Sequence, residues 1–186
     1  MFDHFHILAP CYDRLMGKPD AARLARLLKL PCGGWLLDGG GGTGRASDPL
    51  RPQVGRLVVS DPCARMLSRA RAKKLDAVQA RAERLPFRDG SFDRILVVDA
   101  LHHFGDQAAA IRDFARTLKP GGRIVVEEFD ARRRIVRAIA LAEKVIRMQS
   151  RFLRPQTIRE MMRAGGLMSH VETGPRLAAW IVGDKP

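Results

Sequence analysis

Five glycines within six residues form the densest chemical signal in this chain. They occupy Gly39 to Gly44 and directly follow an apolar run that ends at Asp38. Glycine lets a backbone turn sharply and approach a ligand closely, because no Cβ is in the way. The loop satisfies a dinucleotide pattern, G-x-G-x-x-G, and equally an acid-x-G-x-G-x-G pattern that starts at Asp38. The glycines therefore predict a ligand-binding loop but do not choose between these two kinds of cofactor site.

A second signal is Asp61, which directly follows the apolar run 57–59 and lies 23 positions after Asp38. An acid at the end of the second strand can accept hydrogen bonds from both hydroxyls of a ribose. The alternative is that Asp61 caps a helix that begins near Pro62. Its position after a buried strand favours ribose binding. Together the two signals predict a cofactor that contains adenosine and leave its identity open.

The rest of the chain alternates short β-like runs with longer helical patterns, an order that builds a parallel sheet with helices on both faces. Strands are predicted over 35–38, 57–59, 77–80, 95–98, 124–126, 170–173 and 177–182. Helices are predicted over 19–29, 62–74, 107–118, 132–151 and 155–164. Pro120-Gly121-Gly122 is expected to end the third helix. The length of 186 residues is typical of one domain.

Three further stretches carry a family resemblance. They are Ala82–Asp93 (AERLPFRDGSFD), Asp99–Phe104 (DALHHF) and Leu118–Arg123 (LKPGGR), in this order. With the glycine loop, they make the chain resemble the class I S-adenosylmethionine-dependent methyltransferases, in the type-11 branch that includes the ubiquinone/menaquinone C-methyltransferases. The resemblance runs from about Tyr12 to the last strand. It implies a Rossmann-like α/β fold, with a mostly parallel seven-stranded sheet, an antiparallel C-terminal strand and helices on both faces.

The resemblance also implies a role for individual residues. Asp38 and the loop residues Gly39, Gly40, Gly42, Thr43 and Gly44 would hold the methionine part of S-adenosylmethionine. Asp61 would bind the ribose, Pro62 and Met66 would lie against the adenine, and Ala82 would offer its backbone to the ring with Glu83 beside it. Asp99 would begin the floor beside the methyl group, and Tyr12 would close over the cofactor. Residues 1–30 would form an N-terminal cap within a single domain over 1–186, and 131–165 would roof the acceptor pocket.

One residue departs from the family pattern. The family often has an acid that accepts a hydrogen bond from the adenine amino group, but this chain has Arg81 there, within Ala80-Arg81-Ala82-Glu83. Arginine has only donors and cannot accept that bond. We expect either Glu83 or a backbone carbonyl to replace it, or a weaker affinity for the cofactor.

Two adjacent histidines follow the predicted strand 95–98. A neutral histidine near pH 7 can take a proton from a phenol or an activated carbon, so His102 and His103 are the first candidates for a catalytic base. Glu128, at the end of the next strand, is a further candidate, with Glu127 beside it. The alternative is that one histidine caps the following turn and the other packs. No metal site is predicted, because the three cysteines lie far apart and form no pair with metal-ligand spacing.

The chain carries 33 basic and 20 acidic residues, a net charge of +13. Residues 131–163 hold ten of the basic residues and two of the acidic ones, so the charge is concentrated there. The segment reads as a solvated helix, as a basic amphipathic helix on an anionic membrane, or as a face for an acidic small molecule or partner. No apolar run approaches the ~20 residues of a membrane span. The start lacks a signal-peptide pattern, so a cytoplasmic protein is expected.

These patterns and the resemblance predict methyl transfer from S-adenosylmethionine to a small molecule of a lipid-like or quinone-like kind. An NAD-linked oxidoreductase would explain the glycines and Asp61 but not the later motifs. A catalytically silent protein that binds the cofactor and serves as a partner or regulator is a second alternative. An RNA methyltransferase is a third, but the chain lacks an Asn/Asp-Pro-Pro-Tyr motif, and only 6% of its residues are aromatic and able to stack on bases. No nucleic-acid partner is therefore expected.

Overall fold

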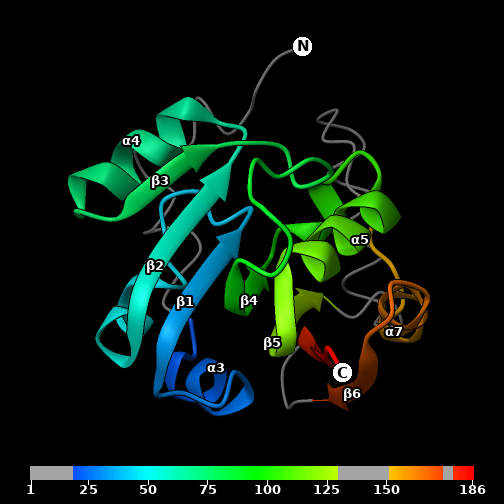
Figure 1. The fold of residues 1–186 in the computed structure, drawn as a ribbon. Helices are drawn as coiled ribbons and strands as arrows, with labels where there is room; N and C mark the ends of the chain where they lie inside the picture. Colours follow the sequence, from blue (N-terminus) through cyan, green and yellow to red (C-terminus); the bar gives the residue numbers. More distant parts are fainter. Residues whose placement is uncertain (1–18, 130–150, 174–177) are drawn as a thin grey trace.

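A computed structural model describes residues 19–129, 151–173 and 178–186 of the protein. Its centre is a seven-stranded sheet in the order β3-β2-β1-β4-β5-β7-β6 (Figure 1). The pairs among β1 to β5 are parallel, whereas β7 runs antiparallel to both β5 and β6. The predicted fold class, a mostly parallel sheet with an antiparallel C-terminal strand, is confirmed.

The strands are β1 (Cys32–Gly39), β2 (Val54–Asp61), β3 (Asp76–Gln79), β4 (Phe92–Val98), β5 (Leu118–Phe129), β6 (Met168–Thr173) and β7 (Ala178–Asp184). The α-helices of the described ranges are α3 (Ala21–Leu27), α4 (Ala64–Ala72), α5 (Gln107–Thr117) and α7 (Pro155–Ala164), with 3-10 turns η1 (Asp48–Gln53) and η2 (Leu101–His103). The predicted helix 132–151, the cap residue Tyr12 and most of the basic segment 131–163 lie outside the described residues.

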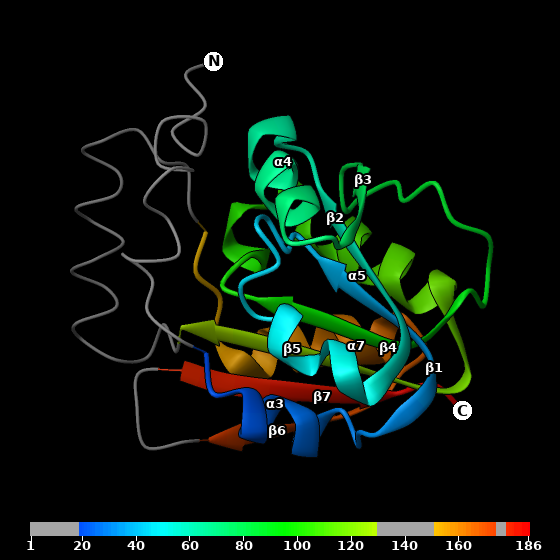
Figure 2. The same cartoon turned by 90° about the vertical axis from the view of Figure 1, so that its left-hand side faces the viewer.

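The sheet is buried on both faces, which explains the continuous apolar runs of its central strands. Leu36 of β1 packs in one core cluster with residues of α3 and α4. Leu37, the next residue, packs in a second cluster with residues of α5 and α7. In Figure 2, α3 lies in front of the sheet and α7 behind it. Successive strand residues thus enter opposite cores, as the two-residue period of a strand requires.

The strand β5 differs from the prediction, because it begins at Leu118 and includes Pro120-Gly121-Gly122. Its register against β4 shifts between Phe92 and Arg94, so these residues form an irregular start of the strand and not a break before it. Gly121 has a φ of +73°, and its N–H donates to the Lys185 carbonyl at 2.9 Å. The C-terminal end of the chain therefore extends the sheet over residues that looked like a turn.

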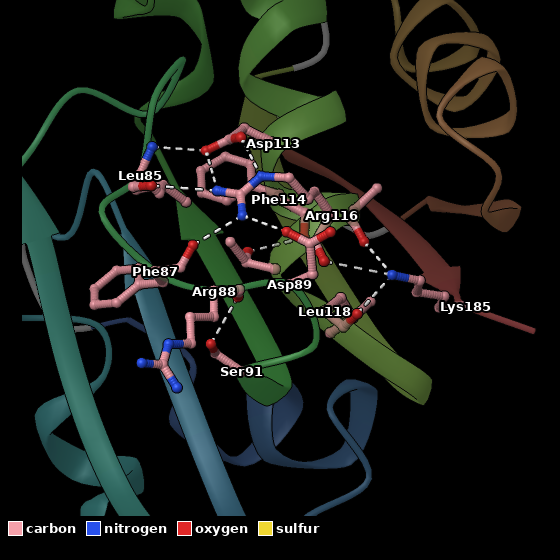
Figure 3. A network of polar contacts seen from close by, with 12 residues as sticks. Leu85, Phe87, Arg88, Asp89, Ser91, Asp113, Phe114, Arg116, Leu118 and Lys185 are labelled. Atoms are coloured by element: carbon pink, nitrogen blue, oxygen red, sulfur yellow. Dashed lines mark hydrogen bonds and ion pairs between the residues drawn. The ribbon is translucent and has the colours of Figure 1, made fainter.

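The connection between β3 and β4 is held by Arg116 of α5 (Figure 3). Its guanidinium donates to the backbone carbonyls of Phe87 (2.8 Å) and Leu85 (3.2 Å). It also forms ion pairs with Asp113 and Asp89, both at 2.7 Å. Asp113 in turn accepts from the Leu85 N–H at 2.6 Å. Within the motif Ala82–Asp93, residues 85–89 thus belong to a polar network that fixes the loop against α5.

The order of the strands brings three carboxyl ends together. β1 pairs with β2 on one side and with β4 on the other, and all three are parallel. In sheets of this kind, ligands bind outside the carboxyl ends where the strand order reverses.

Within the described ranges, no helix is long and apolar enough to cross a membrane.

Candidate active site

A cavity of about 350 Å³ lies at the carboxyl ends of β1, β2 and β4. Three segments line it: Asp38, Gly40, Gly41, Gly42, Arg45 and Ala46 from the first, Asp61, Pro62, Cys63 and Met66 from the second, and Val98, Asp99, Ala100, His103 and Phe104 from the third. Sites for small ligands commonly enclose about 300–1,000 Å³. The structure therefore brings together seven of the predicted cofactor residues (Asp38, Gly40, Gly42, Asp61, Pro62, Met66 and Asp99), together with His103.

The glycine loop curves around the cavity through backbone angles that favour glycine. Gly40 and Gly42 have φ values of +70° and +56°. A Cβ at Gly40 would come within 2.8 Å of the Ala100 Cβ and 3.0 Å of the Phe104 ring. The N–H of Gly40 donates to the Ser60 carbonyl at 2.8 Å, which holds the loop against β2. Gly40 and Gly42, two glycines of the acid-x-G-x-G-x-G pattern, thus occupy positions whose backbone angles favour glycine.

The other predicted loop residues, Gly39, Thr43 and Gly44, do not belong to the cavity lining. A Cβ at Gly39 would lie 2.5 Å from the Phe114 ring, and one at Gly44 would lie 2.3 Å from Leu75. Both glycines are therefore required for packing. Thr43 is fully buried, and its carbonyl accepts from the Lys73 ammonium at 3.1 Å.

Asp61 lies at the end of β2, with one carboxylate oxygen on each of two backbone donors. Oδ2 accepts from the Gly42 N–H at 3.1 Å, and Oδ1 accepts from the Cys63 N–H at 2.7 Å. The N-cap residue of α4 is Cys63 rather than Asp61, so Pro62 precedes the helix. Asp61 thus links the glycine loop to the start of α4 and lines the cavity between them.

Asp38 is the fully buried acid of the site. Its Oδ2 accepts a 2.5 Å hydrogen bond from the Ser47 hydroxyl, while Oδ1 is buried without a hydrogen-bond partner. Burial raises the pKa of the Asp38 carboxyl to about 6, although the Ser47 hydrogen bond acts in the opposite direction. An acid with an uncompensated oxygen at the end of β1 favours a positively charged or hydrogen-donating ligand nearby.

Asp99 follows β4 and faces the glycine loop across the cavity. Its φ of +50° is unusual for a residue other than glycine. Its carboxylate forms a 3.3 Å ion pair with Arg45, and both side chains are mostly buried. Burial raises the pKa of Asp99, and Glu128 adds to the effect while Arg45 opposes it. Arg45 was not among the residues predicted for the site, because its partner Asp99 lies 54 positions further along the chain.

The two histidines of η2 have different surroundings. His103 lines the cavity, whereas His102 is 4% exposed and is not among the lining residues. The His102 Nδ1 lies 2.7 Å from Glu128 Oε2, and its ring stacks on Phe152 at 4.4 Å. Of the three predicted candidates for a base, only His103 therefore lines the cavity, and His102 and Glu128 support it from behind.

We expect His103 to make the fold less stable in acid. Burial, and to a smaller extent the neighbouring His102, lowers the pKa of His103 from 6.5 to about 3. The unfolded chain therefore binds a proton near pH 6.5 that the folded chain does not bind until about pH 3, so stability falls as the pH drops through this range. Urea unfolding at pH 4 to 7 should show that His103→Gln flattens the fall by about 1 kcal/mol per pH unit. The exposed His170, changed to Gln, is the control, and an equal slope in both variants would contradict this role.

Ala82 and Glu83, which were predicted near the adenine, do not belong to the cavity lining. Glu83 Oε1 accepts from the Gly105 N–H at 2.9 Å and lies 3.4 Å from the Arg81 guanidinium. Partial burial acts to raise the pKa of Glu83, but hydrogen bonds from its own N–H, from Arg81 and from the Asp106 N–H together lower it. Arg81 is thus an ion-pair partner of Glu83, and the pair fixes the loop after η2.

An adenosine cofactor fits this set of residues. The Asp61 carboxylate is partly exposed at one end of the cavity, and the apolar side chains of Met66 and Pro62 lie beside it. The missing Cβ of Gly40 leaves space between the glycine loop and Ala100. These features match a ribose acid, an adenine slot and a backbone that approaches its ligand closely.

Comparisons with known proteins find relatives both of the sequence and of the fold. A methyltransferase domain family, Methyltransf_11, matches residues 37–126. The ubiquinone/menaquinone biosynthesis C-methyltransferase UbiE of Pseudomonas aeruginosa is 38% identical over 144 residues, which cover 67% of this chain and 56% of that protein. The Coxiella burnetii UbiE is 38% identical over 112 residues, covering 54% and 45%. The chain thus spans about half the length of the curated relatives that it matches.

A solved structure of an S-adenosylmethionine-dependent methyltransferase from Thermotoga maritima superposes with a TM-score of 0.81 at 26% identity, covering 98% of both chains. The fold is therefore that of the Rossmann-like class I methyltransferases, and the cofactor of this family is S-adenosylmethionine. Within that class, residues 37–126 match the Methyltransf_11 domain family, as the sequence motifs predicted.

Proposed function

We propose that this protein transfers a methyl group from S-adenosylmethionine to a small-molecule acceptor that binds beside Asp99 and His103. The observation that carries the proposal is the single cavity whose lining includes Asp61 at the end of β2 and the Asp99–His103 wall after β4. Asp61 would hold the ribose, and the opposite wall would face the reacting methyl group. When bound, the cofactor supplies a methyl group that its sulfonium already activates.

The chain's own residues then have to bind, align and exclude water. Gly40 and Gly42 would let the backbone approach the methionine part of the cofactor, and the buried Asp38 would favour its positive charge. Phe104 and Ala100 would make an apolar wall that limits water beside the reacting atoms. Because the pKa of His103 lies well below 7, its imidazole is neutral at physiological pH and can accept a hydrogen bond from the acceptor's O–H or N–H.

The acceptor that we propose is lipid-like or quinone-like. This proposal is supported by the UbiE relatives, which are named for ubiquinone and menaquinone biosynthesis. It is also supported by the unbalanced charge of residues 131–163, where ten basic residues would favour an anionic membrane surface or an acidic acceptor.

The test is methyl transfer from labelled S-adenosylmethionine to separate lipid, small-metabolite and RNA fractions. We expect label in the lipid or small-metabolite fraction, and we expect His103→Phe to lower its rate at least tenfold while cofactor binding persists. Label confined to RNA would overturn the proposed acceptor class. Tight cofactor binding with no label in any fraction would instead support a silent cofactor-binding protein.

A further inference from the structure

The segment that enters α7 is attached to the pocket wall through its backbone. The Arg151 N–H donates to the His102 carbonyl at 2.8 Å. The Gln107 side-chain amide donates to the Arg151 carbonyl at 2.8 Å and to the Leu101 carbonyl at 2.9 Å. The Phe152 ring stacks on the His102 ring with an angle of 21° between their planes. The backbone N–H and carbonyl of Arg151 and the side chain of Phe152 therefore contact either η2 or Gln107.

The turn η2 is held from its other side by β5. Glu128 Oε2 lies 2.7 Å from the His102 Nδ1, and Glu128 Oε1 accepts a hydrogen bond from the His102 backbone N–H at 3.3 Å. The next residue in η2 is His103, which lines the cavity. The position of the cavity wall thus depends on two sets of contacts to η2, those of Glu128 and those of the segment 151–152.

The Gln107 side chain is not needed to cap α5. It is the first residue of α5, but the cap of that helix is Asp106, whose carboxylate accepts from the Ala109 N–H at 2.9 Å. The Gln107 side chain is 7% exposed and points away from the helix ladder toward the two carbonyls. A buried amide that donates to two separate segments is suited to joining them.

We propose that Gln107 is a positioning residue that fastens the Arg151–Phe152 peptide to η2, so that docking of this segment and binding of the cofactor are coupled through His102 and His103. The coupling to the cofactor rests on the proposed function, whereas the fastening rests on the contacts alone.

Trypsin provides a direct test, because its cleavage site after Arg151 is the peptide whose carbonyl Gln107 holds. In Gln107→Glu the carboxylate cannot donate to either carbonyl. We expect the release of fragments that begin at Phe152 to be about tenfold faster than in the wild type, since cleavage requires this segment to open. Gln107→Met, which is similar in size and also lacks a donor, should behave alike and replaces the Glu variant if that variant does not fold.

Two controls separate local from global opening. Cleavage after Arg163, inside α7, reports unfolding of the helix and should change little in Gln107→Glu. Gln53→Glu makes the same charge change in η1, far along the chain from η2, and should leave cleavage after Arg151 at the wild-type rate. An unchanged rate of cleavage after Arg151, measured relative to Arg163, in both Gln107 variants would overturn the proposal.

The coupling is tested by adding S-adenosylhomocysteine during proteolysis. In the wild type, saturating ligand should slow cleavage after Arg151 at least threefold more than cleavage after Arg163, and Gln107→Glu should lose this difference. Equal protection at both sites would overturn the coupling. If calorimetry shows that the ligand does not bind at all, the proposed function fails, while the effect of Gln107→Glu without ligand still decides the fastening.

Discussion

Replacement of Asp61 with alanine is expected to weaken binding of S-adenosylmethionine by about 100-fold or more. The variant lacks the carboxylate and so would lose two charge-assisted hydrogen bonds to the ribose, each worth about 1.5–3 kcal/mol. The variant would also lose the hydrogen bonds that the carboxylate accepts from the Gly42 and Cys63 N–H groups, which shape the glycine loop and the start of α4. Isothermal titration calorimetry measures the effect directly.

The matched control is Asp76→Ala, at the opposite end of the neighbouring strand. Asp76 is about half exposed and forms a surface ion pair with Arg56 at 2.7 Å. Exposed pairs of this kind contribute about 0–1 kcal/mol, so this variant should bind the cofactor as the wild type does. Unchanged binding by Asp61→Ala would contradict the assignment of the ribose site to Asp61.

Replacement of Arg116 with methionine is expected to reduce the free energy of unfolding by about 3 kcal/mol. The change removes the ion pairs with Asp113 and Asp89 and leaves the Leu85 and Phe87 carbonyls without this donor. Hydrogen bonds to charged groups contribute about 1.5–3 kcal/mol each, and partial exposure of Arg116 reduces their sum. Its carboxylate partners raise the pKa of Arg116, so the guanidinium stays charged in any folded state.

Thermal unfolding should show this loss as a fall in Tm of about 6–12 °C, given about 2–4 °C per kcal/mol for a chain of this size. Arg112→Met, an exposed position of the same helix, is the control and should shift Tm by no more than about 2 °C. Equal shifts in the two variants would show that the Figure 3 network does not stabilise the fold.

The sequence predicted the sheet well because its central strands are buried on both faces. Runs such as Ile95–Val98 can only be strands of a covered parallel sheet once helices alternate with them. Asp61 was also accessible to sequence reasoning, because its meaning comes from position: an acid directly after the second strand stands beside the glycine loop in this fold. These inferences depend on local pattern and on topology, which the chain displays directly.

Other parts of the site depend on contacts between residues far apart in sequence. The pairing of Arg45 with Asp99 joins positions 54 residues apart, and no local pattern announces it. His102 and His103 look equivalent in the sequence, yet Glu128 and Phe152 hold one of them away from the cavity. The glycines at 121 and 122 resembled a turn, but the returning C-terminal end of the chain pairs with them.

The central claim is that the cavity between Asp61 and Asp99 holds S-adenosylmethionine. A crystal structure with bound S-adenosylhomocysteine tests it most directly. We predict the ribose hydroxyls at about 2.5–3.0 Å from the Asp61 carboxylate, the adenine against Met66, and the sulfur facing Asp99 and His103. A ligand bound elsewhere on the protein, or one whose ribose makes no contact with Asp61, would contradict the account.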